Sequence, residues 1–430
     1  MSVVGIVVFT VLMVAVLSAI NAQVFRWARN AFALDDRKRR VLKWTLIASI
    51  AGMVLGRVAG RFWPGALATA VIAVGSTVQL AVIISGVLLL VADAALLLGV
   101  LLRRVRQRAS AASGLAPSAL ARPKDTERTE AEPRPASPPA SELPRRTFLT
   151  QAAAGSAFLI GSSSSLYGAL KGRSDYAIEE VPIQLSGLSR ALDGFTIAQL
   201  SDVHIGAFTG DAELAIAEEL VRQTRADLIV LTGDLLDNDG RLAPQLGRFV
   251  RRLTPLARHG VVAVSGNHDY FAGIDEMAGA ITGGGGRILR NEALVLGGPS
   301  AGFALLGVDD VWARRRRIGG PDLAAAITTL PRLAGKHAPA LDLPRVLLCH
   351  NPSFFDEAAG RVALQLSGHT HGGQVNLGVR PADYVLPGGW VAGRYELGES
   401  QLYVNRGFGT VGPPARLGAP PEVTRVVLTA

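Results

Sequence analysis

Five short polar stretches in the second half of this 430-residue chain each follow directly after a run of aliphatic residues. The polar stretches are Ser201 to His204, Thr232 to Asp234, Ser265 to Asp269, Cys349-His350 and Ser367 to His371. The runs that precede them are Phe195 to Leu200, Leu228 to Leu231, Val261 to Val264, Val346 to Leu348 and Val362 to Leu366. Short apolar runs that end in turn residues are typical of buried strands. Because open α/β sheets place their sites at the carboxyl ends of strands, we expect the five stretches to meet at one edge.

The side chains in these stretches are of the types that bind divalent metal ions. Asp202 and His204 are two residues apart, so in an extended segment both side chains point to the same side. His369 and His371 repeat this spacing. Asp234 ends the next strand, and a carboxylate has two oxygens that can bridge two cations. Mixed oxygen and nitrogen ligands suit Mn, Fe, Zn or Co, so the sequence predicts a two-metal site.

The motifs Asp-x-His, Gly-Asp, Gly-Asn-His-Asp, a single His and Gly-His-x-His occur in this order along the chain. Residues 185 to 430 thereby resemble the calcineurin-like metallophosphoesterase superfamily. The longer stretches Gln199 to His204, Leu231 to Asp234 and Gly368 to Gln374 resemble its bacterial membrane-anchored or exported branch, related to the YkuE and YaeI phosphoesterases. The resemblance implies an α/β fold in which a β-sandwich of two sheets is flanked by helices, in an αββα order.

The resemblance also implies a role for each residue of the site. Asp202, His204, Asp234 and His371 would hold the first ion, and Asp234, Asn267, His350 and His369 the second. Water activated by the ions would attack phosphorus in line. His268 would protonate the leaving oxygen, with Asp237 as its orienting partner, whereas no role is implied for Asp269.

The first 104 residues carry about three candidate transmembrane helices. Val3 to Ile20, Val41 to Gly60 and Ala66 to Leu102 are apolar runs long enough for a bilayer core of roughly 30 Å, at about 1.5 Å per residue. The third run has 37 residues, which fits one tilted helix or a hairpin of two. Asp93 within it is either a functional intramembrane acid or, as we favour, faces a neighbouring helix.

Residues 105 to 144 are rich in Pro, Ala, Ser and mixed charge, a composition typical of a disordered cytoplasmic linker. Arg145-Arg146, followed by Phe148-Leu149 and an uncharged stretch to Leu170, resembles a twin-arginine export signal. An ordinary fourth span with cytoplasmic arginines explains the same pattern and gives the same orientation. Because no cleavage site is evident, we expect residues 145 to 170 to remain as an anchor.

The positive charge of the chain lies beside its apolar segments. Lys plus Arg number 21 against 11 Asp plus Glu in residues 1 to 180, and 23 against 24 in the remainder. Basic loops stay in the cytoplasm, so the clusters at Arg37 to Lys43, Arg103 to Arg108 and Arg145-Arg146 predict a multi-pass plasma-membrane protein. The domain formed by residues 181 to 430 would then lie outside the cytoplasm. Its near-neutral charge and this location argue against nucleic acid as a partner.

The expected function is that of a membrane-anchored, dinuclear-metal-dependent phosphoesterase acting on phosphodiesters or phosphomonoesters. Its substrate would be a phosphorylated small molecule, a lipid or another envelope-linked compound, and the twin-arginine translocase would be a partner in export. The alternative is a catalytically spent metal-binding sensor or scaffold in the membrane. The intact motif set favours the enzyme, because a degraded ligand at Asp234 or Asn267 would have favoured the scaffold.

Further elements are expected in the second half of the chain. Asp211 to Thr224, Leu242 to Ala257 and Pro321 to Leu330 have helical patterns, and Gly283 to Gly286 is a flexible loop rather than a phosphate cradle. Cys349 is the single cysteine and is expected to be a buried core thiol. Arg314 to Arg317 either contact an anionic substrate or lipid headgroups, or form a solvated loop.

Overall fold

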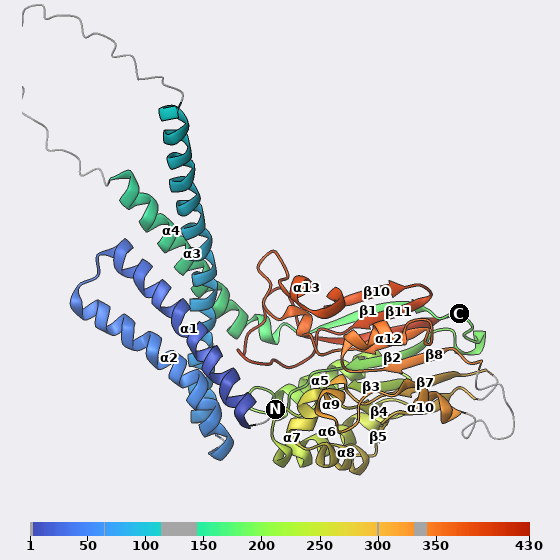
Figure 1. Cartoon of the computed structure of the whole chain (residues 1–430). Coiled ribbons are helices and arrows are strands. Elements are labelled where there is room, and N and C mark those ends of the chain that lie inside the picture. The colour runs from blue at the N-terminus through green and yellow to red at the C-terminus, as the bar shows by residue number, and fades with distance from the viewer. Residues whose placement is uncertain (1–2, 64, 113–143, 299–300, 331–341) are drawn as a thin grey trace, which may run out of the picture. The chain divides into compact units, whose positions relative to one another are not determined.

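Figure 1 shows a computed structural model of the chain, which describes residues 3–63, 65–112, 144–298, 301–330 and 342–430. The chain divides into two compact units. The first includes Ala51–Thr77 and Ser164–Ala430, and the second is made of Ile6–Ile50 and Val78–Ser163.

Two six-stranded sheets form the centre of the first unit, within the described residues. The first sheet has the order β1 (Ala177–Gln184), β12 (Glu422–Thr429), β2 (Phe195–Leu200), β3 (Leu228–Thr232), β4 (Val261–Val264) and β5 (Arg287–Ile288). The second has the order β10 (Gly393–Leu397), β11 (Ser400–Val404), β9 (Leu364–Ser367), β8 (Arg345–Leu348), β7 (Phe303–Gly307) and β6 (Glu292–Leu296). Strands β2, β3 and β4 run parallel to one another, as do β7, β8 and β9. The carboxyl ends of each set therefore lie at one edge of its sheet.

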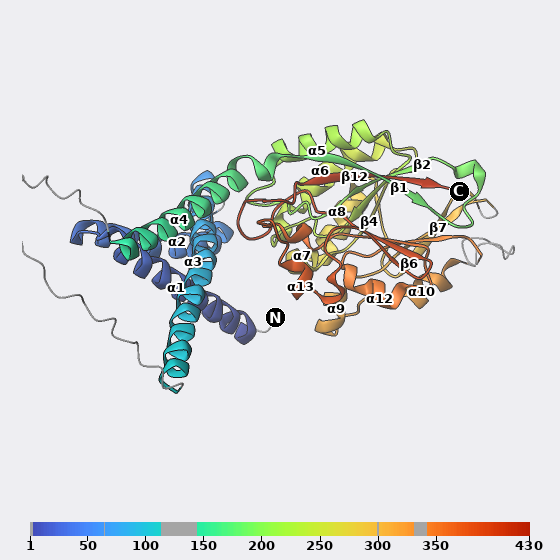
Figure 2. The ribbon, with the colours of Figure 1, turned by 90° about the horizontal axis from the view of Figure 1, so that it is seen from above.

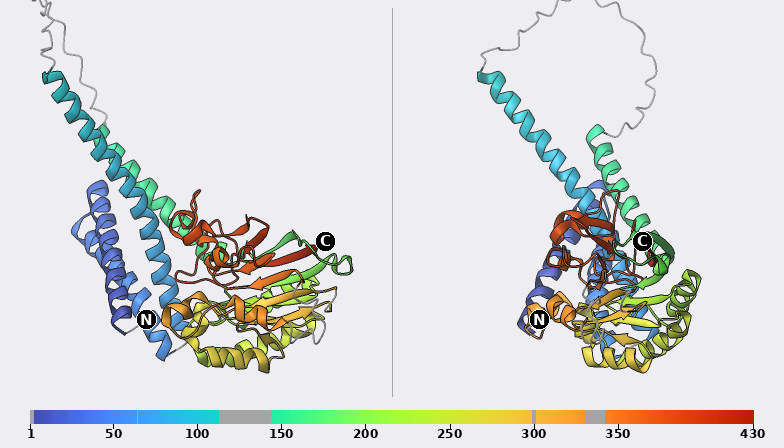
Figure 3. Two further views of the ribbon diagram at one scale, coloured as in Figure 1. Left: turned by 45° about the vertical axis from the view of Figure 1, so that its right-hand side comes forward. Right: turned by 90° about the vertical axis from the view of Figure 1, so that its right-hand side faces the viewer.

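The two sheets stack face to face and share one apolar core (Figure 3). Ile197 of β2 and Val230 of β3 pack in this core with Val346 of β8 and Leu366 of β9. The strands β2, β3 and β4 are buried at every position, which explains why their sequences are continuous apolar runs rather than alternating ones.

Helices cover both outer faces of the sandwich, as Figure 2 shows. The helices α5 (Asp211–Thr224), α6 (Ala243–Leu253) and α8 (Ile274–Gly283) cover the first sheet with side chains such as Leu214, Phe249 and Ile281. The second sheet is covered by α9 (Val311–Arg316), α10 (Leu323–Thr328) and α12 (Phe355–Ala358), with Ala313, Ala326 and Ala358 buried. Two short helices, α7 (Asn267–Ala272) and α13 (Ala382–Val385), complete this unit. The predicted αββα sandwich is confirmed.

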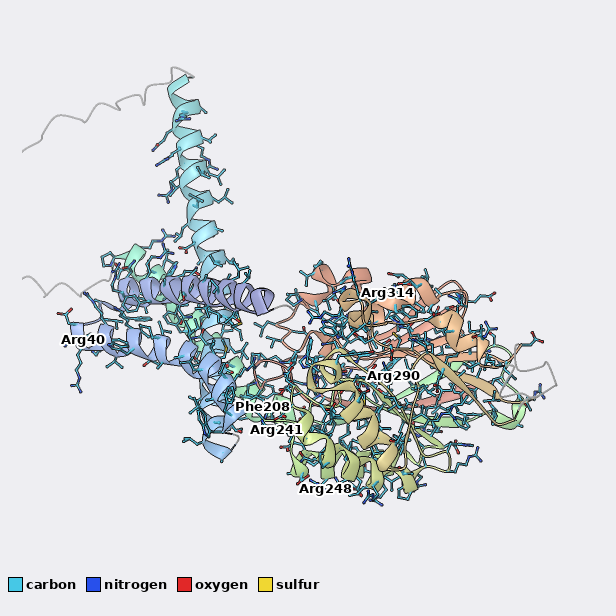
Figure 4. All side chains as sticks on the ribbon, turned by 60° about the horizontal axis from the view of Figure 1, so that its bottom comes forward. Arg40, Phe208, Arg241, Arg248, Arg290 and Arg314 are labelled. Carbon is cyan, nitrogen blue, oxygen red and sulfur yellow. The ribbon has the colours of Figure 1, made fainter. Side chains whose placement is uncertain are left out.

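Several element boundaries differ from the predicted ones. Helix α6 ends at Leu253 rather than Ala257, because Pro255 follows and Thr254–Leu256 form a 3-10 turn. Of the four arginines for which a solvated loop was one alternative, Arg314 to Arg316 lie in the last turn of α9 and Arg317 is its C-cap. Arg314 (labelled in Figure 4) pairs with Glu357 at 2.7 Å. Cys349 is fully buried, as predicted.

Long helices make up the N-terminal part of the chain. They are α1 (Val3–Phe32), α2 (Asp36–Phe62), α3 (Ala66–Ala112) and α4 (Arg145–Leu170). Among the described residues, three stretches are long and apolar enough to cross a membrane, and they lie in α1, α2 and α3. The third apolar run is therefore one continuous helix. Helix α4 is not among the three, because serines at 162–165 lower its hydropathy, and its role as an anchor stays a prediction.

Polar contacts join the helices of the second unit. The carboxylate of Asp93 in α3 lies 2.6 Å from Arg26, 3.2 Å from Trp27 and 3.3 Å from Gln23, all in α1. Asp93 thus faces a neighbouring helix, as we favoured. Helix α3 continues to Ala112, so the first residues of the predicted linker are helical, in keeping with the helix propensity of Arg and Gln. Residues 113–143 of that linker lie outside the described residues.

Candidate metal centre

The residues predicted to hold the first ion lie together. The Nε2 atom of His371 is 3.3 Å from Oδ1 of Asp202 and 3.1 Å from Nε2 of His204. These three side chains offer ligand atoms that all lie within 4.8 Å of one another, and all three residues are buried. They follow strands β2 and β9, so the two sheets contribute jointly to this cluster.

The residues predicted to hold the second ion form an adjoining cluster. The Nε2 atom of His350 is 3.2 Å from Oδ2 of Asp234 and 3.2 Å from Nδ1 of His369. The same Oδ2 atom of Asp234 lies 3.8 Å from Nε2 of His204, in the first cluster. Asp234 therefore stands between the clusters, which is where a bridging carboxylate must be.

Asn267 begins helix α7, and the next residue donates its backbone N–H to Oδ1 of Asp234 at 2.7 Å. The Oδ1 atom of Asn267 is buried and has no hydrogen-bond partner among the described residues. An unpaired buried carbonyl oxygen is costly, so this atom is available to a metal ion.

The backbone around the two clusters is strained. Positive φ angles occur at five of the predicted ligands, namely Asp202, His204, Asp234, His369 and His371, with values between 49° and 74°. Residues other than glycine rarely adopt this conformation, and such residues gather at functional sites. Gly233 and Gly368 permit the close approach of the loops, since a Cβ atom at Gly233 would lie 2.7 Å from Nδ1 of His350 and one at Gly368 would lie 2.2 Å from Oδ2 of Asp202.

The chemistry of these side chains fits divalent cations. Burial lowers the pKa of His369 to about 3, and burial together with Arg416 holds the pKa of His371 well below its usual value, so both rings are neutral. Neutral imidazole is the form that binds metals. His350 donates from Nδ1 to the carbonyl oxygen of Thr232 at 2.8 Å, so its Nε2 atom is the one that faces Asp234 and His369.

Asp234 and His350 each stabilise the charged form of the other. Burial opposes ionisation of Asp234, but the adjacent His350, His268 and His204 hold its pKa well below the usual range. Burial would lower the pKa of His350, but Asp234 raises it well above its usual value. A proton on His350 thus balances the carboxylate, and a cation at the same place would replace it.

His268 lies beside the predicted ligands and contacts Asp237. Its Nδ1–H donates to the carbonyl oxygen of Asp237 at 2.7 Å, and the Oδ1 atom of Asp237 is 3.3 Å away. Burial alone would lower the pKa of His268, but Asp237 and Asp234 raise it to about 9. The ring is therefore suited to donate a proton from Nε2. His268 also forms a third group of ligand atoms with His204 and Asp234, so geometry alone does not exclude it as a ligand.

Asp269, to which no role was assigned, positions the ligand loops. Its carboxylate accepts backbone N–H groups from Leu235 at 2.9 Å, Leu236 at 3.0 Å and Gly266 at 2.8 Å. It thereby ties the loop after β3, which carries Asp234, to the loop after β4.

Arg416 is a residue of the site that sequence reasoning missed. It is 1% exposed and donates to five backbone carbonyl oxygens, those of Arg406, Gly407, Gly409, Ala419 and His371. Its Nη2 atom also lies 3.1 Å from Nδ1 of His371. The guanidinium therefore fixes the C-terminal loop and the ring of one predicted ligand. The only signal in the sequence is the glycine-rich composition of residues 407–418.

Replacing Arg416 with methionine should destabilise the chain by about 3–5 kcal/mol, because it removes a buried charge and leaves several carbonyl oxygens unpaired. Chemical unfolding of the detergent-solubilised chain measures this loss. Arg394→Met is the matched control, since Arg394 is exposed and, among the described residues, its ion pair is with exposed Glu396, an interaction worth about 0–1 kcal/mol. Equal losses in the two variants would show that Arg416 does not hold the loop.

The sequence is similar to those of known metallophosphoesterases. Residues 195–373 match the family model described as Calcineurin-like phosphoesterase. The chain is 32% identical over 256 residues to the uncharacterized metallophosphoesterase YkuE of Bacillus subtilis, covering 57% of this chain and 82% of the relative. It is 31% identical over 241 residues to the phosphodiesterase YaeI of Escherichia coli, covering 54% and 82%. A transmembrane protein with metallophosphoesterase domain from Danio rerio is 28% identical over 286 residues, covering 63% of this chain and 62% of the relative.

Proposed function

Because the chain belongs to the calcineurin-like phosphoesterase family, we propose that it is a phosphoric ester hydrolase that depends on two divalent metal ions. The observation that carries this proposal is the position of Asp234, whose Oδ2 atom is 3.2 Å from His350 in one cluster and 3.8 Å from His204 in the other. The candidate ligand set is also complete, whereas a spent scaffold would be free to lose ligands.

The proposed ligands divide between the two ions. Asp202, His204, Asp234 and His371 would hold one, and Asp234, Asn267, His350 and His369 the other. When bound, such a pair of Mn, Fe, Zn or Co ions supplies activation of water and neutralises charge on the phosphoryl oxygens. The unpaired Oδ1 atom of Asn267 and the facing ring nitrogens support this assignment.

The proposed reaction is hydrolysis, in which a water oxygen bonds to phosphorus and the ester P–O bond breaks. His268 gives a proton to the leaving oxygen, so that an alcohol rather than an alkoxide departs. Asp237 holds the ring of His268 by its Nδ1 atom and stabilises the protonated form.

We also propose that the catalytic domain is anchored to the plasma membrane and lies outside the cytoplasm. The three apolar helices and the basic clusters beside them support this orientation. Arg145-Arg146 at the start of α4 would engage the twin-arginine translocase. A substrate in the membrane or envelope would then be within reach.

Hydrolysis of bis-p-nitrophenyl phosphate and p-nitrophenyl phosphate by the purified full chain tests the proposed function. Activity should disappear after treatment with a chelator and return when Mn²⁺, Fe²⁺, Zn²⁺ or Co²⁺ is added back. In the proposed reaction only the cations activate water and neutralise charge on the phosphoryl oxygens. If metal analysis finds bound ions and neither ester is hydrolysed, the scaffold alternative is favoured.

A further inference from the structure

A cavity of about 560 Å³ adjoins the candidate metal centre, within the compact unit that combines Ala51–Thr77 with Ser164–Ala430. His268 and Asp237 form part of its wall, together with Phe208 and Arg241, which are labelled in Figure 4. The proposed general acid therefore faces a space large enough for much more than a phosphoryl group.

Another part of the cavity wall comes from helices α2 and α3. Arg57 and Gly60 of α2, and Ala68, Thr69 and Ile72 of α3, line it. The stretches Asp36–Gly60 and Ala66–Ala109 of these helices are long and apolar enough to cross a membrane. Ile72 is six residues into α3, about 9 Å from its start at about 1.5 Å per residue, so this wall lies at the shallow end of the candidate spans.

Small and apolar groups dominate this part of the wall. Most of the surface that lines the cavity is apolar. A Cβ atom added at Gly65 would meet nothing within 4 Å, so there is open space beside this residue. On this side, Thr69 and Arg57 are the lining residues whose side chains can hydrogen-bond to a hydrophilic leaving group such as a sugar or a nucleoside.

Arg57 provides one charged group on the same wall. Its guanidinium donates to the carbonyl oxygen of Gly412, whose loop also lines the cavity. Cationic side chains in apolar helices are rare, and near a helix end they reach the membrane interface or a polar cavity. Arg57 is thus placed to contact a polar or anionic part of a molecule whose remainder is apolar.

We propose that this cavity binds the non-reacting part of the substrate and that this part carries an acyl chain. The substrate class would be a lipid phosphoester that enters from the membrane leaflet next to the catalytic domain, with its phosphate at the metal centre and its chain against α2 and α3. This inference rests on the proposed function, since it assigns the substrate of the same site.

Competition assays on the full chain in phosphatidylcholine nanodiscs test this proposal. Hydrolysis of bis-p-nitrophenyl phosphate is measured with dihexanoyl phosphatidic acid, glycerol 3-phosphate or inorganic phosphate as the inhibitor. The lipid should inhibit at a concentration at least about tenfold lower than glycerol 3-phosphate, a factor that burial of about two methylene groups supplies. The headgroups are alike, so the ratio of the two inhibitory concentrations reports on the acyl chains.

Substitutions at the start of α3 test whether the acyl chains of the inhibitor bind in the cavity. Ala68→Phe fills the cavity and should reduce the inhibitory advantage of the lipid at least about tenfold. Ala70→Phe introduces the same side chain on an exposed part of the same helix and should leave the ratio unchanged. If Ala68→Phe fails to fold, Gly65→Leu replaces it, because its side chain starts in open space.

The outcomes separate the two proposals. If wild-type chain hydrolyses no ester, the proposed function fails. If it hydrolyses bis-p-nitrophenyl phosphate but the three inhibitors act equally, or if both phenylalanine variants keep the lipid's advantage, then the metal centre stands and the acyl-chain site is wrong. Inhibition by free phosphate at the same concentration as the lipid would assign the affinity to the phosphate alone.

Discussion

Replacement of Asp234 with asparagine should remove both metal ions and nearly all turnover. Asp234 lies between the two clusters, 3.2 Å from His350 and 3.8 Å from His204, so its charge would balance two cations at once. Removing one partner from a buried charge pair costs about 3–5 kcal/mol, which corresponds to about 10²–10⁴ fold in an equilibrium or rate constant. Elemental analysis of the purified variant and hydrolysis of bis-p-nitrophenyl phosphate measure the two effects.

The matched control is Asp227→Asn, at the opposite end of the same strand. Asp227 accepts a hydrogen bond from the backbone of Thr196 at 2.9 Å and pairs with Arg258 at 3.2 Å, so its substitution perturbs β3 without touching the clusters. Metal content and turnover should stay close to wild type in this control. An Asp234→Asn variant that retains two ions and normal turnover would show that Asp234 does not bridge the ions.

The strands that position the site could be predicted because they are buried on both faces. Strands β2 and β4 begin and end where their apolar runs do, and the polar stretches that follow them carry Asp202 and Asn267. Parallel pairing of β2, β3 and β4 then brings the carboxyl ends to one edge. The convergence of the motif residues that follow β2, β3 and β4 therefore comes from burial pattern and topology, whereas the motif histidines of the second sheet reach the site through the stacking of the two sheets.

Other parts of the site leave no comparable pattern in the sequence. Arg416 acts through carbonyl oxygens, and every residue carries a carbonyl, so no residue type identifies its partners. The left-handed backbone at Asp202 and His371 also could not be predicted from the sequence, because it is imposed by tertiary contacts rather than by glycine. The cavity combines residues from α2 and α3 with loops more than a hundred positions away, which local periodicity does not reveal.

Replacement of His268 with alanine should leave both ions in place and reduce turnover by about 10²–10⁴ fold, the usual contribution of a general acid. The ring is held through Nδ1 by Asp237, and in the proposed mechanism it binds no metal. His259→Ala is the matched control, because His259 lies before β4 at the opposite end of that strand, with its ring 5.6 Å from that of Phe195. The control should retain metal content and rate.

Varying the leaving group and the pH tests whether His268 donates a proton. A p-nitrophenolate departs readily without protonation, so His268→Ala should lose less activity on aryl esters than on alkyl esters. His268 has a pKa raised to about 9, so its proton is present below that pH and is lost as pH rises through it. Since bound cations oppose protonation, wild-type hydrolysis of alkyl esters should decline at or below about pH 9, and this limb should be absent in the variant. Loss of metal in His268→Ala would instead make His268 a ligand, as its place in the third group of ligand atoms allows. Equal losses on both ester types would show that His268 does not protonate the leaving oxygen.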